Sequence, residues 1–386
     1  MDKMLNFILH VLSYVNFHLF SKKHYKTRKN PSIYISYLIE PFYRSFDPFY
    51  MNTHQNRRET LALKQVFEEL GKGGCFCDYS SQQTIDNSFD IIFGIEPNFE
   101  RMIKRHPRAY KIYYATGAYY KHQNSQIISR TNFVNNKYDI KLSYSRLVEK
   151  HESAELADLI IQIGSAYTKD TYPENLQKKI VTIDQSIISP QLFDIESKVA
   201  NTIKSHYLWF GGYGSVLKGL DLVLDYFSKR TDLTLHVVGP IDADFKDQLM
   251  CRFNEFENIH IYGFLDANGP QLREIFLKTA FIIYPSVSEG GTPGSVLTAM
   301  YHGVIPLVSS YASFEGIESC GLIMSEVSIA GVNEVIRKSE LFTMEEISCR
   351  SYKTADTIKS RFSLENYYKQ MYSIFHSLLK NEEIIC

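Results

Sequence analysis

The stretch FIIYPSVSEGGTPGSVLTAMYHGVIPLVSS, residues 281–310, decides the fold of this chain. It opens with four apolar residues that predict a buried strand, and a helix is expected from about Ser295 to His302. A second apolar strand, Ile305–Ser309, follows at once. The intervening loop holds one acid, Glu289, and three glycines, Gly290, Gly291 and Gly294. Glycines let backbone N–H groups approach a ligand, and a helix N-terminus favours an anion. The loop therefore suits a sugar that carries phosphate.

A second glycine-rich turn lies some 70 residues earlier, in WFGGYGSVLKGLD, residues 209–221. An apolar strand leads into this turn, and Lys218 precedes the helix that follows. Backbone amides together with one ammonium group are what a diphosphate needs. Taken alone, the segment is equally well explained as ordinary punctuation between a strand and a helix.

Together the two segments resemble the group 1 glycosyltransferases, retaining enzymes of GT-B fold that use nucleoside-diphosphate sugars. The residues that match the family pattern are Pro285-Ser286, Glu289, Leu297, Ala299-Met300 and Gly303-Val304-Ile305-Pro306. Two positions depart from it. Thr298 stands where the family has a second glutamate, which grips the nucleotide ribose. Tyr213 stands where the family has an arginine, so Lys218 is the remaining side-chain cation unless another part of the chain supplies one.

The resemblance also implies roles for particular residues. Glu289 would contact hydroxyls of the transferred sugar, and Lys218 would stabilise the departing diphosphate. Family members often carry a histidine near the donor sugar after the strand expected at Lys111–Ala115, and His122 and Tyr119 are the candidates here. The donor-binding residues implied are Gly212, Tyr213, Gly214, Ser215, Gly263, Phe264, Leu265, Gly290, Gly291, Thr292, Gly294, Ser295 and Thr298.

The acceptor side is expected on the first domain, where Asn52–Arg58 takes the place of a glycine-rich loop of the family. His54, Asn56 and Arg57 are its candidate residues. Two simpler explanations stand beside these assignments. Asn56 would also serve as a helix cap, and a surface histidine such as His122 is often just solvated. No metal is expected, because no acidic cluster lies in a plausible metal loop.

Alternating strands and helices predict two doubly wound, Rossmann-like domains that face a central cleft. The strands expected in the first are Ile33–Leu38, Cys75–Asp78, Phe89–Phe93, Lys111–Ala115, Leu159–Ile163 and Ile180–Ile183. Those expected in the second are Tyr207–Gly211, Leu233–Val238, Ile259–Tyr262, Phe281–Tyr284 and Ile305–Val308. Further helices are expected at Asn56–Leu70, in a long region that ends near Leu156, and at Leu364–Lys380. The segments predicted are 1–30, N-terminal, amphipathic and basic; 31–190, acceptor side; 191–360, donor side; and 361–386, a terminal helix. The resemblance to the GT-B family implies that this last helix crosses back to the first domain.

Composition narrows the setting of the protein. The chain has 386 residues and a formal net charge of -1, so no overall field draws it to nucleic acid. Its six cysteines form no disulfide or zinc pattern, which indicates a reducing, cytoplasmic location. At the N-terminus, Met4–Phe20 is apolar except for a stripe of Asn6, His10, Ser13 and Asn16, and five Lys or Arg follow within 22–29. Two placements fit this pattern: a helix on an anionic membrane surface, or a helix packed on the protein.

The resemblance thus implies a retaining glycosyltransferase, and a cell-surface glycan or its lipid-linked precursor is the expected acceptor. Its expected partners are a nucleotide sugar, a glycan acceptor and an anionic membrane surface. Two other classes stay open. One is a nucleotide-sugar epimerase or a phosphorylase of the same fold. The other is a non-catalytic binding or scaffolding subunit, which the departures at Tyr213 and Thr298 would suit.

Overall fold

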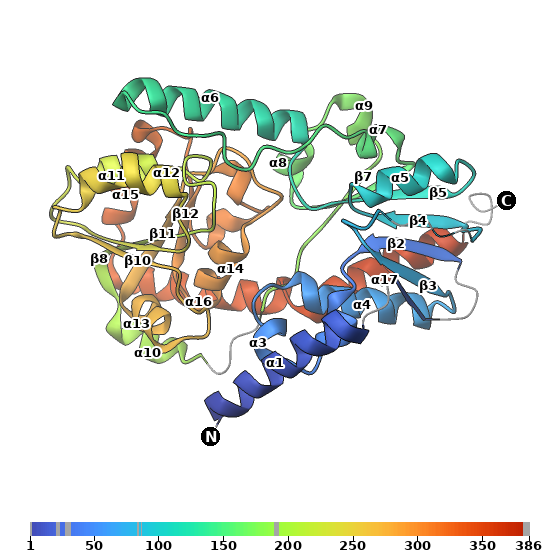
Figure 1. Ribbon diagram of the computed structural model, residues 1–386. Helices are drawn as coiled ribbons and strands as arrows, with labels where there is room; N and C mark the ends of the chain where they lie inside the picture. Colours follow the sequence, from blue (N-terminus) through green and yellow to red (C-terminus); the bar gives the residue numbers. More distant parts are fainter. Residues whose placement is uncertain are drawn as a thin grey trace.

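A computed structural model of the chain describes residues 2–20, 24–27, 32–82, 85, 87–188 and 193–380. It contains two sheets with helices on their faces (Figure 1). The two parallel-sheet domains expected from the sequence are therefore confirmed. Pro190, expected in the interdomain connection, lies outside the described residues, as do residues 381–386.

The first sheet has seven strands in the order β1-β3-β2-β4-β5-β6-β7. They are β1 (His24–Lys26), β2 (Ile33–Tyr37), β3 (Gly74–Asp78), β4 (Ile91–Gly94), β5 (Tyr110–Ala115), β6 (Leu159–Ile163) and β7 (Ile180–Ile183). All neighbours run parallel except β1, which pairs antiparallel with β3. Its helices are α1 (Asp2–Phe20), α2 (Glu40–Arg44), α3 (Pro48–Met51), α4 (Asn56–Glu69), α5 (Asn98–Arg105), α6 (Tyr120–Tyr138), α7 (Ser153–Leu156), α8 (Ala166–Lys169) and α9 (Glu174–Gln177).

The second sheet has six parallel strands in the order β10-β9-β8-β11-β12-β13. They are β8 (Ile203–Phe210), β9 (Thr234–Val238), β10 (Ile259–Gly263), β11 (Thr279–Tyr284), β12 (Ile305–Val308) and β13 (Leu322–Ile323). The helices of this half are α10 (Ile195–Asn201), α11 (Leu220–Phe227), α12 (Ala243–Gln248), α13 (Pro270–Lys278), α14 (Gly294–Tyr301), α15 (Ile329–Glu340) and α16 (Met344–Arg361).

The strands of both sheets are apolar because helices cover both faces. In β2, Ile33 and Ile35 pack with α4 and with the last helix, α17 (Leu364–Lys380), whereas Tyr34 packs with α5 on the opposite face. Side chains that alternate between two buried faces leave no polar face along the strand.

Two helices cross between the halves (Figure 1). The last helix, α17, returns to the first sheet, where the Tyr367 hydroxyl lies 3.0 Å from that of Tyr114. In the other direction, α6 follows β5 of the first sheet but lies along α11 of the second half. There Arg130 makes two hydrogen bonds to Asp221, of 2.9 and 2.7 Å. By its sequence position α6 belongs to the segment 31–190, but its contacts with Asp221 are made to the segment 191–360.

The expectation of a long helical region ending near Leu156 is wrong. The helix α6 ends at Tyr138, because Asp139 adopts a left-handed conformation with φ of 53°. Residues 139–152 form an extended loop that crosses the second half before the short helix α7. This loop contributes to the site described below.

Candidate functional site

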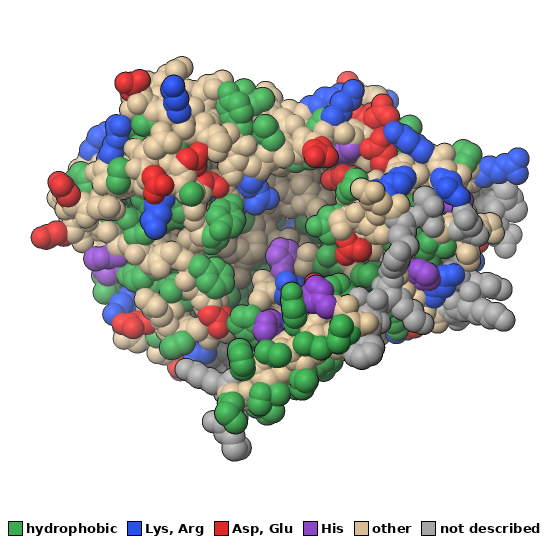
Figure 2. All heavy atoms as spheres, in the orientation of Figure 1, with side chains coloured by type: hydrophobic (Ala, Val, Ile, Leu, Met, Phe, Trp, Pro, Cys, Tyr) green, Lys and Arg blue, Asp and Glu red, His purple; other side chains and the backbone are tan. Residues whose placement is uncertain are grey.

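A cleft of about 870 Å³ lies between the two halves, where both sheets present the carboxyl ends of their strands. Figure 2 shows the hollow, with basic and histidine side chains near its rim. The cleft brings together many of the residues singled out in the sequence. Those that line it are Gly212, Lys218, Phe264, Leu265, Glu289, Gly290, Gly291, Thr292, Gly294, Ser295, Thr298, His54 and Asn56.

Glu289 and Lys218 form an ion pair at the wall of the cleft. The Nζ atom of Lys218 lies 3.1 Å from Oε1 of Glu289, and both side chains are largely buried. The same oxygen accepts hydrogen bonds from Ser286 (3.0 Å) and from the Tyr284 hydroxyl (3.4 Å). Oε2 of Glu289 takes part in none of these contacts. Burial lowers the pKa of the Lys218 ammonium, and the Glu289 carboxylate opposes that shift. A second anion beside Lys218 would further favour its charged form.

Two glycines of the Glu289 loop have a structural role that the sequence did not suggest. A Cβ at Gly290 would lie 2.2 Å from the carbonyl oxygen of Thr116, and one at Gly291 would lie 2.7 Å from Cα of Gly164. Both partners belong to loops of the first half. These two glycines therefore let the halves touch, in addition to leaving the loop open to a ligand. Thr292, next in the loop, has a buried hydroxyl oxygen with no hydrogen-bond partner among the described residues.

The glycine turn after β8 is arranged differently from the prediction. The carboxylate of Asp242 accepts hydrogen bonds from the backbone N–H groups of Gly214 (3.0 Å) and Ser215 (2.6 Å). The glycine-turn amides were expected to face a diphosphate, but those of Gly214 and Ser215 already donate to the Asp242 carboxylate. Ser215 is fully buried, Tyr213 is exposed, and neither lines the cleft. Gly212 does line it.

Arg146 lies beside Tyr213, the residue that stands where the family pattern has an arginine. It stands in the loop after α6 and lines the cleft together with Gly212 and Lys218. Its Cδ atom would lie 2.7 Å from a Cβ added at Gly214, and its Nη1 atom donates to the backbone oxygen of Tyr213 at 3.4 Å. Its positive charge also adds to the lowering of the Lys218 pKa that burial begins. The first half of the chain thus places a second cation beside the glycine turn.

The loop around Arg146 is fixed on both sides. Gln123 donates to the backbone oxygen of Arg146 (3.0 Å), and Ser145 donates to Asp242 (2.8 Å). Asn124 exchanges two hydrogen bonds with the backbone of Val148. Arg146 itself has φ of +69°, which costs on the order of 1–2 kcal/mol for a residue with a side chain. Backbone held in such a conformation is typical of residues that a site positions.

The start of α14 also faces the cleft. Gly294 and Ser295 open this helix and line the cleft. The N–H groups of a helix's first turn have no partner within the helix, so an anion would be favoured at this place. Thr298 lies one turn later and lines the cleft too. Its hydroxyl donates to the backbone oxygen of Gly294 (2.7 Å), which leaves only its lone pairs for a ligand.

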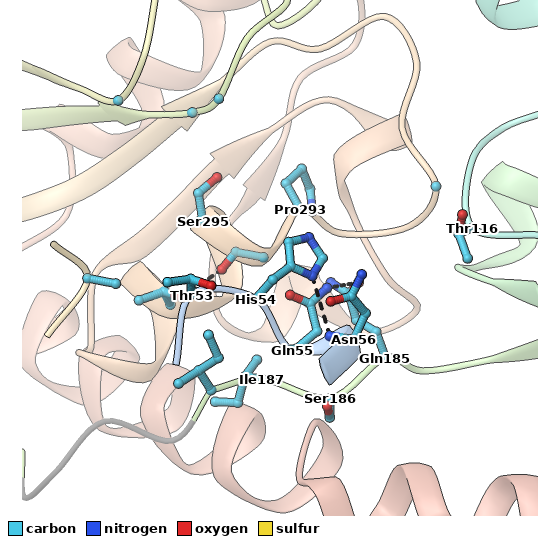
Figure 3. Close-up of a pocket in the computed structure, with 18 of the residues that line it drawn as sticks. Thr53, His54, Gln55, Asn56, Thr116, Gln185, Ser186, Ile187, Pro293 and Ser295 are labelled. Carbon is cyan, nitrogen blue, oxygen red and sulfur yellow. Dashed lines mark hydrogen bonds between the residues drawn. The ribbon is translucent and has the colours of Figure 1, made fainter. Parts of the chain in front are cut away.

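On the first half, the segment between α3 and α4 forms the floor of the cleft. Figure 3 shows His54 pointing toward Pro293 and Ser295 at the start of α14. Nδ1 of His54 accepts the N–H of Asn56 (3.3 Å), so the neutral ring carries its proton on Nε2. Desolvation by the surrounding cleft, followed by the charge of Arg57, lowers the pKa of His54, although its side chain remains exposed at the cleft surface. In its neutral form His54 can donate a hydrogen bond through Nε2.

A chain of amides joins the floor to the Glu289 loop. Gln55 donates to Gln185 (3.2 Å), and Gln185 donates to the backbone oxygen of Thr292 (2.6 Å), as Figure 3 shows in part. Beneath it, Glu59 is buried and accepts from the N–H (2.7 Å) and hydroxyl (2.9 Å) of Ser186. Burial raises the pKa of Glu59 to about 7. The interdomain segment is thus held by polar groups of the first half.

Several candidate residues lie outside the cleft. The Tyr119 hydroxyl donates to Glu155 (2.8 Å) within the first half, and the ring of His122 lies tilted against that of Tyr311 of the second half, with ring centres 5.2 Å apart. Arg57 lies over the ring of Tyr50, with its guanidinium carbon 3.8 Å from the ring centre. These three and Gly263 do not line the cleft. Asn56 is not a cap either, since Gln55 precedes α4 and no side chain caps it.

The comparisons with known proteins agree with this architecture. The structure of HepE from Anabaena in complex with UDP and glucose matches with a TM-score of 0.53 at 13% identity, over 90% of this chain and 99% of HepE. The structure of WaaG, a glycosyltransferase involved in lipopolysaccharide biosynthesis, matches with a TM-score of 0.51 at 13% identity, over 89% and 99%. The fold is GT-B. At such identity the likeness extends to the fold alone.

No protein-family model matches the sequence, and no curated protein matches it. Within the described ranges, no group of three or more His, Cys, Asp or Glu side chains is placed to hold a metal ion.

Proposed function

We propose that the protein is a glycosyltransferase that moves a sugar from a nucleoside-diphosphate sugar to a hydroxyl acceptor, with retention of configuration. The observation that carries this proposal is the meeting of Lys218, Arg146 and the start of α14 around one part of the cleft, with Glu289 beside them. Two cations and a helix N-terminus suit a diphosphate, and a carboxylate with a free oxygen suits a polyol.

In this proposal the diphosphate is the leaving group, and its negative charge grows as the bond to the sugar breaks. Lys218 and Arg146 stabilise that charge, together with the N–H groups at Gly294 and Ser295. Lys218 sits in a buried environment, where such stabilisation is stronger than in water. We propose that these groups meet the charge without a metal ion, so that activity persists in EDTA.

Glu289 orients the transferred sugar. Lys218, Ser286 and Tyr284 hold Oε1 in place, so Oε2 is left to accept hydrogen bonds from sugar hydroxyls. A carboxylate fixed in this way is pre-organised before the sugar binds. The exposed ring of Phe264, which also lines the cleft, is the proposed neighbour of the nucleobase.

The acceptor enters from the floor formed by His54, Gln55 and Asn56. We propose a glycan or lipid-linked glycan of the cell surface as acceptor, and a cytoplasmic protein that associates peripherally with the membrane. The retaining outcome is proposed on the motif resemblance, and hexosyl transfer likewise. WaaG and HepE support the proposal through their fold.

Product analysis tests the proposed function. The purified protein is incubated with each of a panel of nucleotide sugars and with total membrane glycolipid as acceptor, and products are separated by chromatography. A glycosylated lipid or glycan with the donor's anomeric configuration, seen by NMR, is expected. A free epimer of the nucleotide sugar, a sugar 1-phosphate, or no product at all would contradict the proposal.

A further inference from the structure

The N-terminal helix α1 is amphipathic in an unusual sense, because its polar stripe faces the protein. Ser13 is fully buried and donates to Asp47 (2.6 Å), and His10 lies 2.9 Å from the same carboxylate oxygen. Asn16 donates to the backbone oxygen of Tyr43 (3.0 Å). The side chain of Asn6, the fourth member of the predicted stripe, lies outside the described residues.

A buried ionic cluster fixes this orientation. Arg44 donates to Ser13 (3.0 Å), to Asp47 (2.9 Å) and to Glu40 (2.6 Å), and Asp47 is completely buried. Turning the polar stripe outward would leave Asp47 and Arg44 without these partners, at a cost that buried charges make large. The helix is therefore packed on the protein, which is one of the two placements expected from the sequence. It packs through its polar side.

The outward side of α1 is consequently apolar. Its large hydrophobic residues are each at least 42% exposed: Met4, Leu5, Phe7, Ile8, Val11, Leu12, Tyr14, Val15 and Leu19. Figure 2 shows green side chains gathered along α1, whose first turns project beyond the body of the protein in Figure 1. Contiguous apolar surface of this extent marks an interaction site. Of the helices described, none is long and apolar enough to span a membrane.

Charge decides which partner suits this face. The sequence holds no Asp or Glu from residue 3 to residue 39, whereas it holds Lys3, Lys22, Lys23, Lys26, Arg28 and Lys29 there. Of these, residues 22, 23, 28 and 29 lie outside the described part, and their charges are taken from the sequence. An apolar face followed by an acid-free basic stretch is complementary to a bilayer with anionic lipid, not to a second copy of the same positive segment.

Helix α1 also lies next to the acceptor side of the cleft. His10 of α1 packs edge-on against Phe49 of α3, with ring centres 5.1 Å apart. Phe49 is half exposed and lines the cleft, as do Asn52 and Thr53 in the turn that follows. Any surface to which α1 binds would therefore lie next to the part of the cleft that contains His54.

We propose that α1 lies in the surface of an anionic bilayer with its apolar face inserted, and that this placement delivers a lipid-linked acceptor to the cleft. The second clause rests on the proposed function, whereas the first does not. The docking step is tested without donor or acceptor, so its failure is distinguishable from a failure of the enzymatic proposal.

The test is co-sedimentation of the full chain with vesicles of phosphatidylcholine alone or with 30% phosphatidylglycerol. The variant Phe7→Ser/Leu12→Ser removes two outward side chains that make no contact with the buried cluster. The matched control is Leu341→Ser/Met344→Ser, which removes two exposed apolar residues of the second half. We expect at least tenfold weaker partitioning for the first variant, native partitioning for the control, and weaker native binding in 0.5 M NaCl.

A second measurement locates the helix in the bilayer. Trp209, the single tryptophan, is fully buried, so Phe7→Trp introduces one exposed reporter. Blue-shifted emission from this reporter, quenched by brominated lipid only in anionic vesicles, is expected. Absence of quenching, equal partitioning of both serine variants, or a dimer in sedimentation equilibrium that Phe7→Ser/Leu12→Ser dissolves without any vesicle binding would each overturn the proposal.

Discussion

Replacing Arg146 by alanine tests whether a residue of the first half completes the diphosphate site. Arg146 is largely exposed on one side and lies beside buried Lys218 on the other, so its interaction with a phosphate lies between the aqueous and interior limits. A hydrogen bond between charged groups contributes about 1.5–3 kcal/mol. Taking about 2 kcal/mol, affinity for a nucleoside diphosphate should fall roughly 30-fold.

The assay is calorimetric titration of UDP, GDP and ADP, and of the corresponding nucleosides, into native protein and variants. Only the diphosphates should lose affinity, because Arg146 lies beside the glycine turn and Lys218, whereas the nucleobase is proposed to lie against Phe264. Lys150→Ala is the matched control, since it removes an exposed cation of the same loop that does not line the cleft.

Arg146→Lys should fall between the native protein and the alanine variant, because lysine keeps the charge without the bidentate geometry. A change of less than about threefold in diphosphate affinity, or an equal loss for nucleosides and diphosphates, would refute the role given to Arg146.

Three further predictions follow from the same structure. Glu289→Gln should lower kcat by at least about 100-fold while leaving diphosphate affinity within a few-fold, because Lys218 remains; unchanged turnover in steady-state kinetics would remove Glu289 from the mechanism. Burial raises the pKa of Glu59 to about 7, so the folded state binds its proton more tightly than the unfolded state, and the stability that this provides at low pH is lost as pH rises through 7. Relative to Glu59→Gln, the native free energy of unfolding from urea titrations should therefore decline by up to about 3 kcal/mol between pH 4.5 and 8, and a constant difference would contradict the assignment. Gly290→Ala should separate the halves or unfold them, since its Cβ would meet the backbone of Thr116 at 2.2 Å, and an unchanged melting temperature and radius of gyration would contradict that contact.

The architecture could be predicted because apolar strands separated by helices leave few alternatives. The strand, loop and helix around Glu289 were placed to within a residue or two, since β11, α14 and β12 are local features with strong periodicity. The cleft also contains Lys218, Glu289 and His54 as expected. These residues stand directly after strands or at helix starts, where the topology fixes their position.

The remaining parts depend on contacts that no local pattern signals. Arg146 is a single loop residue more than 60 positions from the turn that it covers, and its place follows from α6 crossing to the second half. Asp242 satisfies the Gly214 and Ser215 amides through a turn after β9, so a glycine-rich motif that suggested ligand binding is partly structural. Tyr119 and His122 follow the expected strand, but they contact Glu155 and Tyr311 and do not line the cleft.

The inward polar stripe of α1 also depends on contacts that the local sequence does not signal. The spacing of His10, Ser13 and Asn16 predicts one polar side of a helix, but not that Asp47 and Arg44 would cover it. A sequence read alone assigns polar side chains to water. Only the packed structure shows that the apolar side is the one left exposed.

The most direct test of the central claim is thermal unfolding of the native protein and of Lys218→Ala against a panel of nucleotide sugars. A ligand present at about 100 times its dissociation constant should add roughly 2.7 kcal/mol to the free energy of unfolding. We expect one nucleotide sugar to stabilise the native protein and this stabilisation to be lost in the variant. Stabilisation of neither protein by any nucleotide sugar, or equal stabilisation of both, would contradict it.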